Sequence, residues 1–317
     1  MSLHINSMSR EVVARHHVPV RGRGTQPMLF AHGFGCDQNM WRLVVPAFED
    51  DYCIVLFDHV GSGKSDLSAY SRAKYGQLDG YADDVLSICR EFRLHDVIFV
   101  GHSVSAMIGM LAAIREPQRF AKLILVGPSP CYINDGDYIG GFSRADIDEM
   151  LESLDSNYLG WVSVIAPVIM GNAERPELAS ELANSFCRTD PDIARHFARV
   201  TFLSDNRADL RKVQTPSLIL QCDDDAIAPP SVGGYVHDQL RDSQLVTLRA
   251  TGHCPNLSAP KETIAAIKAA INIPVITPAV TNQRRRRDIP RLSSVVILPW
   301  SIPVSGLVCQ SPLPVAL

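Results

Sequence analysis

Three side chains of the types that cooperate in nucleophilic catalysis occur in the chain order serine, aspartate, histidine. Ser103 stands in Gly101-His102-Ser103-Val104, between an apolar run rich in β-branched residues and a stretch of helical character. This pattern predicts a strand-turn-helix elbow that presents one hydroxyl above the end of a sheet. A serine hydroxyl needs a base within hydrogen-bond reach, and the base needs a carboxylate to orient it. Asp225 and His253 are our candidates for these two roles.

Both partners are expected on loops that follow late strands. His253 lies in Thr251-Gly252-His253-Cys254-Pro255, directly after an apolar strand pattern. Asp225 is the last of three adjacent aspartates and stands four residues before Pro229. Asp225 is preferred as the acid because this is the usual offset between the acid and a proline in folds of this kind. Asp224 is the alternative.

The tetrahedral intermediate of acyl transfer needs two N–H donors directed at its oxyanion. One is expected from the backbone of Val104, the residue after the proposed nucleophile. The other is expected from Phe34, in the loop His32-Gly33-Phe34-Gly35 that follows an early strand. The flanking glycines let this backbone turn inward without a Cβ clash.

Other readings of these motifs have weaker support. His102 adjoins the serine, but we expect its side chain to point away along the turn. The segment Gly61-Ser62-Gly63-Lys64-Ser65 resembles a phosphate loop, yet Asp58 occupies the position where that motif needs glycine. Haloalkane dehalogenases and epoxide hydrolases place an aspartate at the elbow, where this chain has Ser103. A perhydrolase-type oxidation would use the same triad and stays open, and a catalytically dead scaffold is disfavoured because all three positions are filled.

The elements that position these residues alternate between strands and helices. This rhythm predicts an α/β protein with a mostly parallel, doubly wound sheet covered on both faces. Apolar runs predict strands at 27–31, 52–57, 97–100, 123–126, 217–221 and 244–248, with an edge strand at 11–19 and a hairpin turn at 22–24. Helical spacing predicts helices at 36–48, 78–92, 104–115, 232–240 and 262–271.

The alternation stops in the middle of the chain. Between residues 132 and 204, four helices are predicted, at 146–154, 160–170, 176–186 and 191–203. We expect them to form a lid, inserted after the sixth strand, over the carboxyl ends of the strands. The predicted organisation is therefore a core of 1–131 and 205–273, a lid of 132–204, and a tail of 274–317 rich in proline and arginine, for which no ordered structure is expected.

Composition limits the classes of function. The chain has 317 residues, a net charge of −4 and eight dispersed cysteines. This balance gives no reason to expect nucleic-acid binding, and the spacing of cysteine and histidine predicts neither a metal site nor a cofactor. No signal peptide or membrane span is expected. A cytoplasmic location fits these features, with a nuclear one as the alternative if the arginines at 284–287 act as an address.

Several segments together resemble the RsbQ-type α/β hydrolases, a group that includes a bacterial stress-signalling hydrolase and the plant strigolactone and karrikin receptors. The resemblance covers about residues 8–272. It rests on the segments 32–38, 58–66, 78–81, 101–104, 127–132 and 252–255. Val104-Ser105-Ala106-Met107 is more similar to the plant receptors, whereas Cys131-Tyr132 and Gln221-Cys222 are more similar to the bacterial branch.

The resemblance implies an α/β-hydrolase fold with a V-shaped lid over a deep apolar pocket, and it matches Ser103, Asp225 and His253 to the triad. It implies slow hydrolysis of a small lipophilic ester or butenolide lactone, or a ligand receptor that binds a signalling protein and hydrolyses secondarily. Our candidates for the pocket wall are Trp161, Ile165, Phe197 and Phe202 from the lid and Ala226 beside the acid. Ordinary core packing is the competing explanation for the lid residues.

Overall fold

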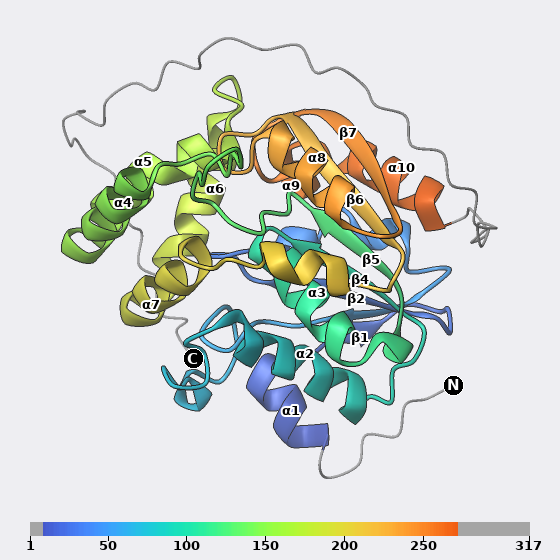
Figure 1. Cartoon of the computed structure of the whole chain (residues 1–317). Helices are drawn as coiled ribbons and strands as arrows, with labels where there is room; N and C mark the ends of the chain where they lie inside the picture. Colours follow the sequence, from blue (N-terminus) through green and yellow to red (C-terminus); the bar gives the residue numbers. More distant parts are fainter. Residues whose placement is uncertain (1–8, 272–317) are drawn as a thin grey trace, which may run out of the picture.

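A seven-stranded sheet forms the centre of the computed structural model, which describes residues 9–271 (Figure 1). Its strand order is β1-β3-β2-β4-β5-β6-β7. The strands are β1 (Val20–Arg21), β2 (Pro27–Ala31), β3 (Cys53–Leu56), β4 (Val97–His102), β5 (Phe120–Val126), β6 (Ser217–Asp224) and β7 (Ser243–Thr251). Only β1 pairs in antiparallel fashion, with β3, while the other pairs are parallel. The predicted mostly parallel α/β architecture is confirmed.

Both faces of the sheet are buried because the central strands are apolar at successive positions. In β4, Val97 and Phe99 join one core cluster, whereas Ile98 and Val100 join the other. The first cluster lies under α2 (Leu78–Glu91), α3 (Val104–Arg115) and α8 (Pro230–Gln239). The second includes residues of two short 3₁₀ helices, η1 (Gln38–Trp41) and η2 (Val45–Ala47), and of α10 (Pro260–Ile271). Because successive side chains of a strand point to opposite faces, neighbouring residues of β4 pack into different clusters, one on each side of the sheet.

Four helices interrupt the sheet between β5 and β6. They are α4 (Arg144–Ser156), α5 (Tyr158–Met170), α6 (Pro176–Cys187) and α7 (Pro191–Phe202). They gather on one side of the sheet, in green to yellow in Figure 1. Side-chain caps fix the starts of three of them, at Ser143, Asn157 and Asp190. The predicted helices are confirmed, but five strands precede them and not the six that we expected.

Three predictions for the N-terminal part are wrong. Residues expected as an edge strand form helix α1 (Ser9–His16), in which Arg15 and Glu11 make an ion pair one turn apart. The turn at 22–24 is no hairpin, because β1 pairs with β3 and not with β2. The helix expected over 36–48 is instead η1 and η2, since Pro46 lacks the N–H that a continuous helix requires there.

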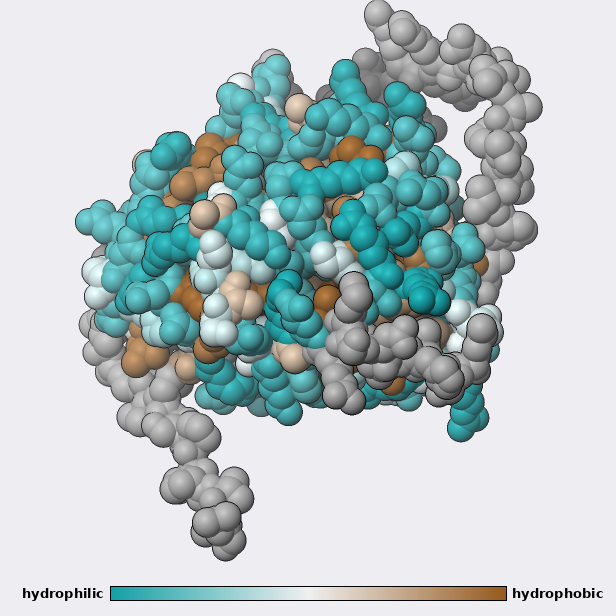
Figure 2. Space-filling view, turned by 90° about the horizontal axis from the view of Figure 1, so that it is seen from below, coloured by the Kyte–Doolittle hydropathy of each residue, from teal (hydrophilic) through white to brown (hydrophobic). Residues whose placement is uncertain are grey.

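Shorter elements complete the core. They are η3 (Leu67–Ala69), η4 (Pro117–Arg119), η5 (Arg207–Lys212) and α9 (Pro255–Ser258). No helix within the described range 9–271 is long and apolar enough to cross a membrane. Hydrophilic side chains cover most of the face shown in Figure 2, with hydrophobic ones in small separate groups. The predicted tail, 274–317, lies outside the described residues.

Candidate active site

Ser103 lies at the tip of a sharp turn between β4 and α3. Its backbone has φ 56° and ψ −124°, a strained conformation for a residue with a side chain. The turn closes tightly, because a Cβ on Gly101 would come within 2.5 Å of the Ser105 carbonyl oxygen. The Ser103 N–H donates to the carbonyl of Val126 on β5, at 2.8 Å. The turn therefore holds the hydroxyl above the carboxyl ends of the central strands.

The three predicted residues meet in one hydrogen-bonded chain. His253 Nε2 lies 2.7 Å from Ser103 Oγ, and His253 Nδ1 lies 2.8 Å from Asp225 Oδ2. All three residues are buried, with exposures of 3–6 %. The histidine can therefore accept the serine proton on Nε2 while Nδ1–H stays bonded to the carboxylate, which is the arrangement of a general base.

The carboxylate of Asp225 has further donors. Its Oδ1 accepts from the backbone N–H groups of Ile227 at 2.9 Å and Ala228 at 3.0 Å. Burial raises the pKa of Asp225, but His253 and these N–H groups outweigh burial and keep the pKa below its ordinary value. Asp224, the alternative acid, is exposed, so its carboxylate is not part of this chain of hydrogen bonds.

His102 bonds the backbone of His253 and not the serine. Its Nε2 lies 2.7 Å from the His253 carbonyl oxygen, which can only accept, so Nε2 carries the proton. Burial lowers the pKa of His102 to about 3. His102 is thus neutral, and its hydrogen bond goes to the His253 backbone and not to the Ser103 hydroxyl.

The loop that carries His253 is anchored to the lid. The His253 N–H donates to the carbonyl of Ile169, near the end of α5, at 2.7 Å. The Asn172 side-chain amide bonds both Met170 O and Thr251 O, at 2.7 and 2.8 Å. Helix α5 and the end of β7 are therefore joined next to the histidine by one backbone hydrogen bond and by the Asn172 side chain.

The two predicted oxyanion donors come from the elbow itself and from the loop after β2. Val104 is the first residue of α3, so no carbonyl within the helix accepts from its N–H. Phe34 belongs to the loop after β2 and lines the same cavity as Ser103. Gly33 is required there, because a Cβ on it would come within 2.5 Å of His102 Nδ1.

A narrow cavity surrounds the hydroxyl, with a volume of about 30 Å³. Its wall is mostly apolar and comes from both the core and the lid. The lining residues are Phe34, Cys36, His102, Ser103, Tyr132, Ile165, Ile169, Leu182, Thr201, Phe202, Ile227, His253 and Cys254. This volume is close to the space of one water molecule and far below the roughly 300 Å³ at which ligand pockets begin.

The predicted pocket residues divide into three groups. Ile165 and Phe202 line the cavity. Trp161 and Phe197 lie one layer behind it, with ring centroids 6.3 and 5.6 Å from that of Phe34. Ala226 is exposed and does not line the cavity, because Asp225 and Ile227 on either side of it point inward.

Tyr132 is a cavity residue to which sequence reasoning gave no role. Its hydroxyl lies 3.5 Å from Ser103 Oγ, and burial raises the pKa of Tyr132 to about 12. Cys36 and Cys254 also line the cavity, and burial raises the pKa of Cys36 to about 12. In the sequence, only their place beside motif residues pointed to these three side chains. Whether each side chain faces the cavity depends on how the loops pack.

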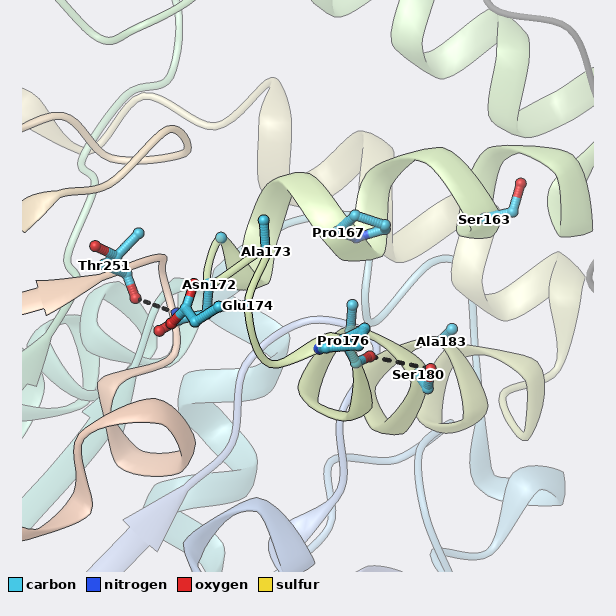
Figure 3. Close-up of a pocket in the computed structure, with 11 residues that line it drawn as sticks. Ser163, Pro167, Asn172, Ala173, Glu174, Pro176, Ser180, Ala183 and Thr251 are labelled. Atoms are coloured by element: carbon cyan, nitrogen blue, oxygen red, sulfur yellow. Dashed lines mark hydrogen bonds between the residues drawn. The ribbon is translucent and has the colours of Figure 1, made fainter.

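A larger hollow of about 640 Å³ lies between α5 and α6, away from the triad. Figure 3 shows Ser163 and Pro167 on α5, Pro176, Ser180 and Ala183 on α6, and Asn172 and Glu174 in the connecting turn. None of the triad residues lines it. The smaller cavity is therefore the candidate active site, although it is not the largest hollow.

The described residues offer no alternative centre for metal chemistry. Within 9–271, no group of three or more histidine, cysteine, aspartate or glutamate side chains could hold a metal ion.

In the loop that resembles a phosphate loop, the Asp58 carboxylate takes the place that an anion would have. It accepts from the backbone N–H groups of Gln38 and Lys64.

Comparison with known proteins agrees with this geometry. The model of the alpha/beta hydrolase family matches residues 28–267. A karrikin insensitive 2 receptor of Petunia hybrida is 40% identical over 80% of this chain and 94% of its own length. The strigolactone esterase of Arabidopsis thaliana is 38% identical over 80% of this chain and 96% of its own. The structure of a hydrolase from Oleispira antarctica, 41% identical, superposes with a TM-score of 0.81 over 83% of this chain and 96% of that one. The chain belongs to the alpha/beta hydrolase family, in the group that contains these plant receptors.

Proposed function

We propose that this protein is a serine hydrolase that slowly cleaves small hydrophobic carboxylic esters or butenolide-type lactones. The observation that carries the proposal is the buried chain Ser103–His253–Asp225, with contacts of 2.7 and 2.8 Å, at the floor of an apolar cavity. The lining favours a lipophilic acyl group.

The reaction follows from the positions of these atoms. Ser103 Oγ attacks the carbonyl carbon while His253 Nε2 takes the hydroxyl proton. The resulting oxyanion accepts from the N–H groups of Phe34 and Val104. His253 then gives the proton to the leaving alkoxide and afterwards activates a water that releases the acid from Ser103. In a lactone, the alcohol stays attached to the acyl group through the carbon chain, and this second step releases both as one hydroxy acid.

Turnover requires a movement of the lid. A cavity of about 30 Å³ does not accommodate an ester, and α5, α6 and α7 all contribute to its wall. These helices must separate from the core before a substrate reaches Ser103. Such a step limits many enzymes and accounts for the slow rate that we propose.

The decisive experiment compares wild type with Ser103→Ala on p-nitrophenyl acetate. Loss of the nucleophile should reduce kcat by at least about 10³-fold, since the hydroxyl forms the covalent intermediate. Ser87→Ala, which changes a half-buried serine on α2 whose hydroxyl bonds the Asp83 carbonyl, is the matched control and should retain the wild-type rate. Equal rates for wild type and Ser103→Ala would sink the proposal.

A receptor function is the second candidate. It is favoured by the 40% identity to a protein named as a karrikin insensitive 2 receptor, which extends over most of both chains. In this role a butenolide ligand would hold the lid in one arrangement, a signalling protein in the cytoplasm would bind that arrangement, and hydrolysis would be secondary.

The two roles differ in what ligand binding does without turnover. A receptor should show a raised Tm of the Ser103→Ala variant with a butenolide, together with slower hydrogen exchange in α4 to α7. Ile165→Trp, which fills the cavity, should abolish both effects. An unchanged Tm and unchanged exchange at saturating butenolide would leave only the hydrolase function.

A further inference from the structure

The hydroxyl of Ser105, two residues after the proposed nucleophile, makes two buried hydrogen bonds. Ser105 Oγ lies 2.5 Å from the carbonyl oxygen of His32 and 2.7 Å from Nε2 of His59. A carbonyl can only accept, so the single hydroxyl proton points at His32 O. His59 Nε2 must therefore carry a proton and donate it to Ser105. Helix α3 is thus tied to the end of β2 through one side chain.

His32 extends the same network into the oxyanion loop. The backbone N–H of His59 donates to His32 Nε2 at 3.1 Å, so that nitrogen carries no proton. His32 Nδ1 then holds the proton and donates it to the carbonyl of Gly33 at 2.8 Å. This carbonyl belongs to the same rigid peptide unit as the N–H of Phe34. Fixing one end of the peptide fixes the direction of the other.

His59 is neutral in this network. Burial lowers the pKa of His59 well below its ordinary value, and the neighbouring His32 acts in the same direction. The rings of Phe57, Tyr81 and Phe197 pack around it, with centroids 5.1 to 6.2 Å away. A neutral His59 keeps its one proton on Nε2, where Ser105 needs a donor.

We propose that His59 and Ser105 are positioning residues that hold the His32–Gly33–Phe34 backbone so that the Phe34 N–H faces the oxyanion. This inference rests on the proposed hydrolase function and assigns work to a serine at the position where the elbow motif usually has glycine. Neither side chain touches the substrate. Their effect should appear when negative charge develops on the carbonyl oxygen, and not when the substrate binds.

Kinetics of Ser105→Ala and His59→Phe test the proposal. Removing a whole oxyanion donor costs about 10²–10³ in kcat, so letting one donor drift should cost about tenfold, with KM changed less than about threefold. The double variant should lose no more than either single variant, because both act through one network. Ser87→Ala is again the control. A kcat within twofold of wild type for both single variants would overturn the proposal, as would losses that multiply.

A second measurement separates positioning from general damage to the fold. A trifluoromethyl ketone forms a tetrahedral adduct on Ser103 whose oxyanion occupies the proposed hole. Its affinity should fall by the same factor as kcat in Ser105→Ala, and Ser105→Thr, which keeps the hydroxyl, should restore both. A decrease in kcat with unchanged affinity for the ketone would contradict positioning.

The proton positions can be read without any activity. Two-bond ¹H–¹⁵N spectra of the wild-type protein should show His59 protonated on Nε2 and His32 protonated on Nδ1. The reverse tautomers would refute the network even if the protein hydrolyses esters. Conversely, a protein with these tautomers and no Ser103-dependent turnover would refute the proposed function and leave the hydrogen-bond network intact.

Discussion

Two adjacent aspartates differ completely in what they contact. Asp225 accepts three hydrogen bonds, from His253 and from two backbone N–H groups, whereas the side chain of Asp224 is exposed. The difference arises where β6 ends at Asp224, because the chain then turns so that the N–H groups of Ile227 and Ala228 face the Asp225 carboxylate. Only one of the two carboxylates can therefore orient the histidine.

Replacing each aspartate by asparagine tests the assignment of Asp225 as the acid. Asp225→Asn should lower kcat on p-nitrophenyl acetate by about 10³–10⁴-fold with little change in KM, because the amide favours the wrong histidine tautomer. Asp224→Asn should stay within about twofold of wild type. Similar losses in both variants would show that the acid is wrongly assigned.

At the scale of elements, the wall of the cavity is shared between lid and core. Leu182 from α6 is 2 % exposed and faces the hydroxyl cavity together with Ile165 from α5. The size of these side chains limits the acyl group that can fit. Substrate preference is therefore expected to depend on the lid and not on the triad.

Leu182→Ala should shift that preference. The shorter side chain leaves room for a longer acyl chain. The ratio of kcat/KM for p-nitrophenyl butyrate to that for p-nitrophenyl acetate should therefore rise about tenfold. The free energy of unfolding should fall by about 2–5 kcal/mol, as for other buried leucines. Leu159→Ala, which changes a leucine of α5 that is 52 % exposed, should alter neither quantity. An unchanged ratio in Leu182→Ala would mean that α6 does not limit the acyl chain.

The sequence predicted the lid helices well because their patterns are local. Each has an apolar face at helical spacing, and capping residues such as Ser143 and Asp190 stand where the helices begin. Helix α1 was missed because Val12 and Val13 favour a strand locally. Tertiary contacts outweigh that preference, since the buried ring of His16 lies 3.7 Å from Asp84 on α2.

Part of the site could also be predicted, because local patterns in the sequence mark the ends of strands. Ser103, Asp225 and His253 follow strand ends, and the carboxyl ends of parallel strands meet at one edge. Tyr132 and Thr201 reach the cavity only through the path of loops and helix ends, for which a single sequence holds no signal. Ala226 illustrates the reverse error, because a residue next to the acid in sequence points the other way in space.

The whole molecule should be sensitive to acid. His59 and His102 are fully buried, and burial lowers the pKa of both, that of His102 to about 3. In the unfolded chain each histidine binds a proton below about pH 6.5. Below that pH the unfolded state therefore binds about two more protons than the folded state, and protonation favours unfolding.

Stability should fall more and more steeply as the pH drops from 6.5 to 5, and these two histidines bring the slope to about 2.7 kcal/mol for each pH unit near pH 5, at about 1.4 kcal/mol for each histidine. Urea unfolding at several pH values measures this slope. His102→Gln should reduce the slope near pH 5 by about 1.4 kcal/mol per pH unit, which is the contribution of one buried histidine. A free energy of unfolding that does not change over this range would contradict the burial of neutral histidines.

The hydrogen bond from the His253 N–H to Ile169 O joins the proposed base to the end of lid helix α5. The donor of this bond is therefore part of the proposed site, and its acceptor is part of the lid. The proposed turnover requires α5 to withdraw, which would release this amide, so its deuterium uptake would measure those openings. Comparing the uptake rate with the turnover number would reveal how many openings the protein makes for each molecule that it cleaves.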